Sequence, residues 1–302
     1  KRPAQTESYF VARLAEQAKH PSIANPVSIE DLCDKLATYL EPDQIATLKK
    51  LKIPDTDDSH KFHGRDVKAS VRAIWNGRNF DEHADLTTAG TRRVGLVLDK
   101  TNFYAEMGGQ VSDHGRMLVT RETRSNASDA HHGGEFRVED VQAFGSYVLH
   151  IGRVTRGEVR VGDDVQLHID NQRRQRVAAN HTATHLLNLA LRKVLGPEVD
   201  QKGSLVSDDR LRFDFSRTGS VSPEELGRVQ SIVSELIERD LAVYADLADL
   251  KTARTINGLR AVFGETYPDP VRVVSIGAPV DELLANPSDA RWAELSIEFC
   301  GG

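Results

Sequence analysis

Two histidines at helical spacing are the first candidates for chemistry in this sequence. His181 and His185 lie within residues 178–195, a stretch without proline or glycine that ends in Gly196-Pro197 and therefore predicts a helix. Side chains one turn apart leave the same helix face with Cβ atoms about 6 Å apart, so both imidazoles could bind one ion. Cys300 could add a thiolate, because the glycines after it let the backbone approach an ion closely. Together these residues predict a zinc site.

The zinc prediction competes with a simpler interpretation of the histidine pair, because pairs at this spacing also arise by chance on helix surfaces. The residues between them, Thr182, Ala183 and Thr184, are small enough to let a substrate reach an ion. Structural zinc sites usually have four protein ligands, whereas catalytic sites keep one position for water. Three ligands therefore indicate either a catalytic site or a site whose fourth ligand is missing from this sequence.

Three regions with different hydrophobic patterns must position these residues. Residues 1–55 have apolar residues at helical spacing and predict a helical lead-in and linker over 1–64. From Val67 to Ile169, apolar and polar residues alternate in short runs between Gly- and Asp-rich turns, with no helical stretch. A run of strands of this kind predicts a small antiparallel β-barrel over 65–170.

The third region, 171–302, combines helices with strands. Ser222-Pro223-Glu224-Glu225 is a capping box at the start of a second predicted helix. Strand candidates lie between or after the helices, at 211–215, 271–273 and 295–299. This region therefore predicts an α+β core with an antiparallel or mixed sheet, and the whole chain an α+β fold.

The composition is that of an ordinary globular chain. Of 302 residues, 39% are hydrophobic and 28% are charged, and no apolar run approaches the roughly 20 residues of a membrane helix. Two cysteines exclude a disulfide framework and favour a reducing, intracellular setting. A net charge of −6 argues against general attraction to polyanions, so the basic clusters 49–52 and 173–176 predict either a local RNA contact or a solvated face. Because the sequence begins without Met, we expect a piece of a longer protein.

Several sequence blocks, in one order over about 65–302, carry a family resemblance. The blocks are 98–110 (LDKTNFYAEMGGQ), 181–187 (HTATHLL), 201–206 (QKGSLV), 211–215 (LRFDF), 271–274 (VRVV) and 296–302 (SIEFCGG). Together they closely resemble the editing region of alanyl-tRNA synthetases, which are class II enzymes related to free-standing alanyl-tRNA editing proteins.

The resemblance implies a deacylase that hydrolyses serine or glycine wrongly esterified to tRNA(Ala). It implies Zn²⁺ as the cofactor, held by His181, His185 and Cys300, and a fourth ligand histidine from the family's final motif, Cys-Gly-Gly-Thr-His, of which this sequence contains the first three residues. The expected pocket residues are Gln201, Thr182, Thr184, Gly108 and Gly109.

The same resemblance implies that another part of a longer parent enzyme carries out aminoacylation. The parent ligates alanine to tRNA(Ala) with ATP, and no stretch of this sequence can be assigned to adenylate chemistry. We expect tRNA(Ala) as the partner, no DNA and no membrane, and a cytoplasmic location.

Two of the expected pocket elements also have simpler interpretations. Gln201 by its spacing alone is a surface glutamine, and Gly108-Gly109 by itself is a turn that needs positive φ. Gly108-Gly109-Gln110 also occurs in peptide-release factors, which hydrolyse an ester on tRNA, but three residues are too few to indicate common ancestry.

Three alternative functions follow from the same residues. A free-standing editing protein would act in trans, although such proteins usually begin near the barrel and residues 1–55 favour a synthetase fragment. Threonyl-tRNA synthetase editing shares the histidine pair and cysteine but not the block that ends in Gly108-Gly109-Gln110. A non-catalytic, zinc-containing RNA-binding module would use the barrel and residues 173–176 to bind duplex phosphates.

Overall fold

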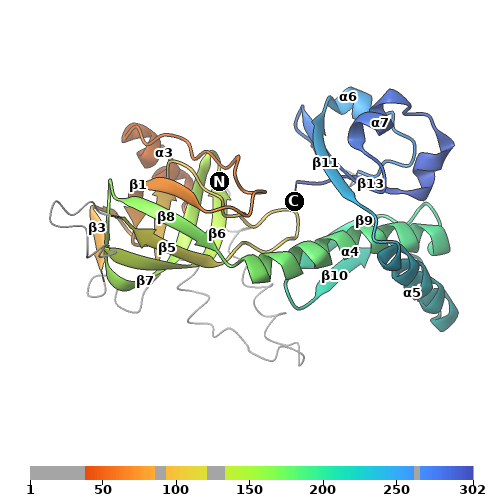
Figure 1. Cartoon of the computed structure of the whole chain (residues 1–302), viewed down its shortest axis with the longest axis horizontal. Helices are drawn as coiled ribbons and strands as arrows, with labels where there is room; N and C mark the ends of the chain where they lie inside the picture. The colour runs from red at the N-terminus through yellow and green to blue at the C-terminus, as the bar shows by residue number, and fades with distance from the viewer. Residues whose placement is uncertain (1–37, 86–92, 121–132, 262–265, 302) are drawn as a thin grey trace, which may run out of the picture.

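The computed structural model describes residues 38–85, 93–120, 133–261 and 266–301 (Figure 1). Of the predicted helical lead-in, residues 1–37 lie outside the described residues, and the described part contains helix α3 (Pro42–Lys50). Within the described ranges, no helix is both long and apolar enough to cross a membrane.

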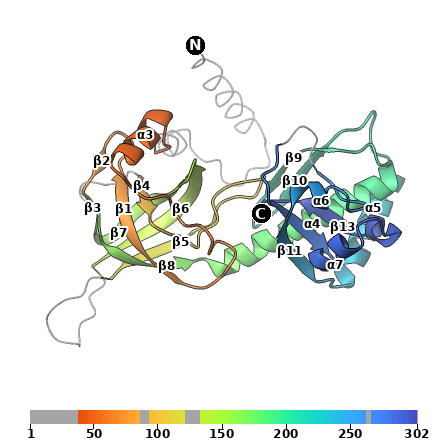
Figure 2. The same ribbon diagram turned by 90° about the horizontal axis from the view of Figure 1, so that it is seen from above.

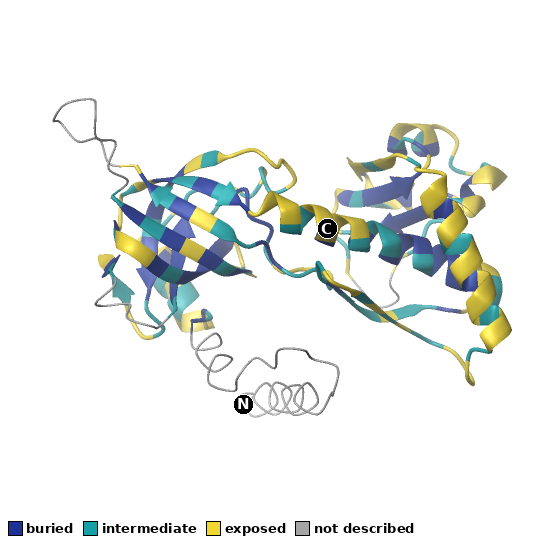
Figure 3. Cartoon of the chain, turned by 60° about the horizontal axis from the view of Figure 1, so that its bottom comes forward, coloured by how far each residue is buried: buried dark blue, intermediate teal, exposed yellow. Residues whose placement is uncertain are grey.

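Six strands form a closed antiparallel barrel, as the alternating pattern predicts. Buried and more exposed residues alternate along the strands (Figure 3), and buried apolar side chains fill the interior. The short strands β2 (Phe80–Asp81) and β3 (His83–Asp85) pair with the barrel from outside this order. The order around the barrel is β1 (Val67–Trp75), β4 (Val94–Leu98), β7 (Tyr147–Arg160), β6 (Gly134–Phe144), β5 (Gly115–Val119) and β8 (Asp164–Ile169), and β8 pairs with β1 again.

The remaining residues form an α+β unit, which confirms the predicted fold class. Its elements are helix α4 (Asn171–Leu195), the hairpin β9 (Gln201–Val206) and β10 (Leu211–Phe215), helix α5 (Pro223–Glu238), the antiparallel sheet β11 (Val243–Ala248), β12 (Val271–Ile276) and β13 (Ser296–Phe299), the short helices α6 (Leu250–Ala253) and α7 (Val280–Ala285), and a 3₁₀ turn η1 (Ala290–Glu294). Helix α4 runs from the barrel into this unit (Figure 1) and packs against α5 through Leu189, Leu236 and their neighbours.

Helix α4 begins earlier than the sequence predicts. Its first residue is Asn171 and not a residue near 178, because Asp170 caps the helix by accepting a hydrogen bond from the Arg173 backbone N–H at 2.9 Å. The predicted end at Gly196 is confirmed, with φ of 110°. The capping box that starts α5 is also confirmed. The division of the chain at 64 and 170 into three domains stays a prediction.

Candidate metal centre and its pocket

Helix α4 holds the two histidines side by side. The rings of His181 and His185 are stacked, with centroids 4.9 Å apart and planes 21° apart, as expected for side chains one turn apart. The two residues are only 9% and 7% exposed. The histidine pair is therefore not on the solvated helix surface that the simpler interpretation required.

Cys300 reaches the histidines from the end of strand β13. Its backbone N–H donates to the carbonyl of Arg272 on β12 at 3.2 Å, so the neighbouring strand fixes its position. The Sγ atom lies 3.2 Å from Nε2 of His181. One donor atom from each of His181, His185 and Cys300 lies within 4.8 Å of the other two. The structure thus brings together three residues separated by up to 119 positions in the sequence.

A side-chain oxygen accepts a hydrogen bond from Nδ1 of each histidine, the ring nitrogen that faces away from Cys300. His185 Nδ1 donates to Oε2 of Glu298 at 2.8 Å, and Oε1 of Glu298 accepts from the Asn188 side chain at 2.9 Å. His181 Nδ1 donates to Oε1 of Gln110 at 2.5 Å. Each ring therefore keeps Nε2 for a ligand. Histidines that bind metal ions usually donate their second N–H in this way, which fixes the tautomer and the ring orientation.

Glu298, Asn188 and Gln110 were not predicted as site residues from the sequence. Two of them had a signal in the sequence. Glu298 lies two positions before Cys300 in a predicted strand and so shares its face, and Asn188 lies three positions after His185 on the helix. Gln110 directly follows Gly108 and Gly109, which the family resemblance places in the pocket, but no spacing relates it to His181 on α4.

The local electrostatics favour a thiolate at the centre. Burial alone raises the pKa of Cys300, but hydrogen bonds and charge from His181 and His185 outweigh burial and lower that pKa to about 5. Burial lowers the pKa of His185, whereas the negative charge of Glu298 raises it, and the net result is a pKa of about 10. The lowered pKa of Cys300 favours its thiolate form, which is the form that binds a metal ion.

The donor set fits Zn²⁺. Two imidazole nitrogens and one thiolate are ligands that tetrahedral zinc accepts, and ligands must be deprotonated to bind it. Zinc binding would release any proton held by the three ligand atoms, and the ion would supply the positive charge that compensates the thiolate. Three protein ligands leave one tetrahedral position for a further ligand or for water.

A cavity of about 480 Å³ opens onto the metal centre. This volume is within the range of small-molecule sites. Four of the five expected pocket residues lie on its wall: Gly108, Gly109, Thr184 and Gln201. Thr182 is not among the lining residues.

The Gly108-Gly109 pair forms a tight turn that docks on the β9 strand. Both glycines have positive φ, at 61° and 84°, and Met107 pairs with Gln110 across the turn. A two-residue turn with two positive φ angles is of the kind that strongly prefers glycine. The turn interpretation of these glycines is therefore correct, and the same turn also lies on the cavity wall.

The basic cluster 173–176 has internal partners. Arg174 forms an ion pair with buried Asp113, and Arg173 and Arg176 both pair with Asp208, at 3.4 and 3.2 Å. Arg173 and Arg174 are only 12% and 17% exposed. These two guanidinium groups join α4 to the rest of the fold, so neither a solvated face nor a simple phosphate-binding surface describes them.

Comparison with known proteins identifies a matching family and similar proteins. Residues 38–173 match the family described as tRNA synthetases class II (A). The chain is 45% identical over 259 residues to the mitochondrial alanine–tRNA ligase of Saccharomyces cerevisiae, covering 86% of this chain and 25% of that protein. It is 43% identical over 270 residues to the cytoplasmic alanine–tRNA ligase of Dictyostelium discoideum, covering 89% and 27%.

A third relative extends the similarity to almost the whole chain. The alanine–tRNA ligase of Schizosaccharomyces pombe is 41% identical over 289 residues, which is 95% of this chain and 29% of that protein. The chain thus spans between a quarter and a third of the length of these relatives. The family expected from the sequence blocks is confirmed: over most of its length, this chain is homologous to a segment of the alanine–tRNA ligases, which are class II aminoacyl-tRNA synthetases.

Proposed function

We propose that this chain is the editing segment of an alanine–tRNA ligase and that it hydrolyses serine or glycine mischarged onto tRNA(Ala). The observation that carries the proposal is the cavity at the metal centre, in which the donor atoms of His181, His185 and Cys300 meet the polar wall residues Gln201 and Thr184. The ATP-dependent ligation of alanine belongs, in this proposal, to the rest of the parent protein. Relatives named both cytoplasmic and mitochondrial exist, and we propose the cytoplasm for this one.

The proposed cofactor is Zn²⁺, held by Nε2 of each histidine and Sγ of Cys300. When bound, it would supply a positive charge that orients the amino acid or the attacking water. Hydrolysis of an activated ester needs little more than a positioned water and donors for the developing oxyanion. Gln201, whose side-chain amide donates to Ser204 at 3.2 Å, is held at the cavity wall where it can orient the ester.

Thr184 supplies a basis for telling serine from alanine. Its hydroxyl donates to the carbonyl of Asn180 at 2.8 Å, so the lone pairs of the same oxygen can accept from the hydroxyl of a bound serine. Alanine has no such hydroxyl and gains no such bond. The difference is worth about 1–3 kcal/mol for a buried polar group, enough for preferential hydrolysis of the serine ester.

Loss of the ester from charged tRNA tests the proposal directly. The chain would be incubated with serine-charged and alanine-charged tRNA(Ala), with and without a zinc chelator, in parallel with a version extended by the Thr-His of the family motif. We expect selective loss of serine and its suppression by the chelator or by His185→Ala. His83→Ala, at an exposed position on β3, is the matched control and should keep the activity.

The outcomes separate the proposal from its alternatives. Activity in the extended version alone would assign the fourth ligand a required part. Binding of tRNA without ester loss in either version would overturn the deacylase and favour the RNA-binding module. Serine hydrolysis that survives complete removal of zinc would keep the deacylase and remove the metal from its chemistry.

A further inference from the structure

We propose that Gln110, delivered by a loop of the barrel, is a positioning residue for the metal centre on α4. The inference rests on the proposed zinc site and adds a residue that holds one of its ligands. It makes the barrel a structural part of that site, although the three metal-ligand candidates all belong to the α+β unit.

The contact between Gln110 and His181 fixes which nitrogen of the ring is available. Nδ1 of His181 lies 2.5 Å from Oε1 of Gln110, and Nε2 of the same ring lies 3.2 Å from Sγ of Cys300. Because the amide oxygen only accepts, it holds the proton on Nδ1 and leaves the Nε2 lone pair directed at the centre. Glu298 does the same for His185, so each histidine has one oxygen partner, one from each part of the fold.

The loop that carries Gln110 is anchored at its tip against strand β9. Val206 donates its backbone N–H to the carbonyl of Gly109 at 2.7 Å, and its own carbonyl accepts from Val111 at 3.0 Å. These two bonds flank Gln110 and form an isolated parallel β-bridge between Gln110 and Val206 at the end of β9. In Figure 2 the loop between β4 and β5 leaves the barrel and reaches the neighbourhood of β9.

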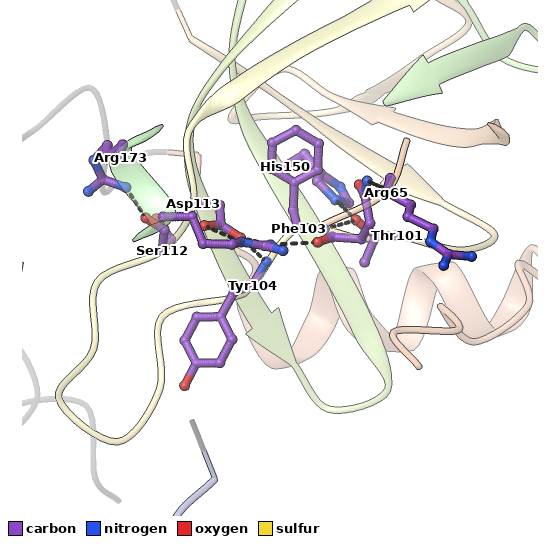
Figure 4. A network of polar contacts seen from close by, with 10 residues as sticks. Arg65, Thr101, Phe103, Tyr104, Ser112, Asp113, His150 and Arg173 are labelled. Carbon is purple, nitrogen blue, oxygen red and sulfur yellow. Dashed lines mark hydrogen bonds and ion pairs between the residues drawn. The ribbon is translucent and has the colours of Figure 1, made fainter. Parts of the chain in front are cut away.

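The base of the same loop is anchored to α4. Asp113 accepts from the backbone N–H of Tyr104 at 2.6 Å and forms an ion pair with Arg174, which also donates to the carbonyl of Asn102 at 2.7 Å (Figure 4). Arg173 adds a bond to the carbonyl of Ser112 at 2.7 Å (Figure 4). Both ends of the loop are therefore tied together and to the start of the helix.

The spacing of the anchors along α4 aligns the loop with the histidine. Arg174 and His181 are seven positions apart, which is two helical turns and the same face. The helix thus binds the base of the loop at Arg174 and its tip at His181. A side chain so restrained keeps its acceptor in place without depending on the metal ion.

Metal affinity of Gln110 variants tests this inference. The affinity of the chain for Zn²⁺ and Co²⁺ would be measured by competition with a chelator, together with the cobalt–thiolate absorption of the bound Co²⁺. Gln110→Met keeps the size and removes the acceptor, so we expect an affinity about 10–100-fold weaker and a changed cobalt spectrum. Gln110→Glu keeps an acceptor and should bind metal as tightly as the unsubstituted chain. Gln166→Ala, at a half-buried barrel position on β8, is the control for loss of a glutamine.

The outcomes distinguish failure of the role given to Gln110 from failure of the proposed zinc site. If Gln110→Met loses its fold, as seen by thermal unfolding, Gln110→Asn withdraws the acceptor with a smaller change and replaces it in the comparison. If the unsubstituted chain binds metal and the Met or Asn variant binds it equally tightly, the inference is wrong while the zinc proposal stands. The same conclusion follows if Gln110→Glu weakens metal binding as much as the Met or Asn variant does. If neither the unsubstituted chain nor the version extended by Thr-His binds either metal, the zinc proposal fails and this inference fails with it.

Discussion

Glu298 accepts a hydrogen bond from Nδ1 of His185 across 2.8 Å, and both residues are buried. The carboxylate also holds the side chain of Asn188, so its two oxygens serve two residues of the same helix. Strand β13 therefore contains Glu298, which orients the ligand candidate His185, and leads directly into the ligand candidate Cys300.

Replacing Glu298 tests how much its hydrogen bond to His185 contributes to zinc affinity. Glu298→Gln keeps the size but removes the charge that stabilises the donor on His185, so we expect zinc affinity to fall about 10–100-fold. Glu294→Gln is the matched control, because Glu294 forms an exposed pair with Lys193 at 2.5 Å and lies away from the cavity. Equal affinities for the two variants, measured by chelator competition, would contradict the role given to Glu298.

The two basic residues Arg174 and Arg176 should differ sharply in their effect on stability. Arg174→Met leaves the carboxylate of Asp113, 7% exposed, without its charged partner, and should lower the free energy of unfolding by about 3–5 kcal/mol. Arg176→Met removes a half-exposed pair with Asp208 and should change it by about 1 kcal/mol or less. Urea unfolding of both variants measures the difference, and similar values would show that the Arg174 pair is not a structural link.

Ala substitutions at the two turn glycines should separate backbone strain from loop docking. Among the described residues, a Cβ at Gly108 would meet no atom within 4 Å, so Gly108→Ala adds only the strain of positive φ, about 1–2 kcal/mol. A Cβ at Gly109 would lie 2.6 Å from the carbonyl oxygen of Ser204. Gly109→Ala should therefore push the loop from β9, weaken zinc binding and slow serine hydrolysis far more than Gly108→Ala. Equal effects of the two variants on metal affinity would refute this docking.

Thr184 and Thr182 should differ in their effect on selectivity. Thr184→Val removes a hydroxyl from the cavity wall, so hydrolysis of the serine ester should fall about tenfold relative to the glycine ester, which has no hydroxyl to bind. Thr182→Val alters a side chain that is not among the lining residues and should have a smaller effect. The ratio of serine to glycine hydrolysis on tRNA(Ala) measures this, and a larger change for Thr182→Val would reverse the assignment.

His150 should make the barrel sensitive to acid. Burial lowers the pKa of this fully buried ring to about 4, from an ordinary value of 6.5. Its Nδ1 donates to the carbonyl of Leu96 at 3.1 Å, and Nε2 accepts from Thr101 at 2.7 Å (Figure 4). Above pH 6.5 the ring is neutral in the folded and unfolded chain, and its contribution to stability is complete. As the pH falls from 6.5 to 4, the unfolded chain binds the proton first, so stability falls by on the order of 3 kcal/mol and then levels off.

The pH dependence of unfolding measures the effect of His150. Its replacement in His150→Gln should flatten the fall in the free energy of unfolding between pH 6.5 and 4, even if the variant is less stable at pH 7. His83→Gln, at an exposed position on β3, should leave the slope as it is. An unchanged slope in His150→Gln would assign the acid sensitivity to other groups.

Periodicity and spacing predicted the features that depend on neighbouring residues in the chain. The alternation from Val67 to Ile169 predicted the barrel, Gly196 predicted the end of α4, and the helical spacing of His181 and His185 predicted that their side chains lie together. The start of α4 was missed because the residues after Asp170 are polar and form no apolar stripe. Helix geometry alone could not have separated Thr184 from Thr182, because Thr184 is three positions from His181 and Thr182 is three positions from His185.

Features that depend on long-range contacts were not predictable. Gln110 and His181 are 71 positions apart, and Arg174 and Asp113 are 61 positions apart. The family resemblance placed Gly108 and Gly109 in the pocket, but no periodicity in the loop indicates which residue of α4 its neighbour Gln110 contacts. The internal pairing of Arg173 and Arg174 was equally hidden, because an arginine in a basic cluster looks the same in sequence whether or not an acidic side chain lies nearby.

The pairing of β8 with β1 has a consequence for how the site opens and closes in time. A closed barrel has no free edge, so a strand can leave it only by breaking two ladders at once. Amides in these strands should therefore exchange with solvent together, in one cooperative unit and not strand by strand. Because the loop that reaches His181 has both ends in this unit, between β4 and β5, the opening rate of the barrel sets an upper limit on how long that loop stays docked.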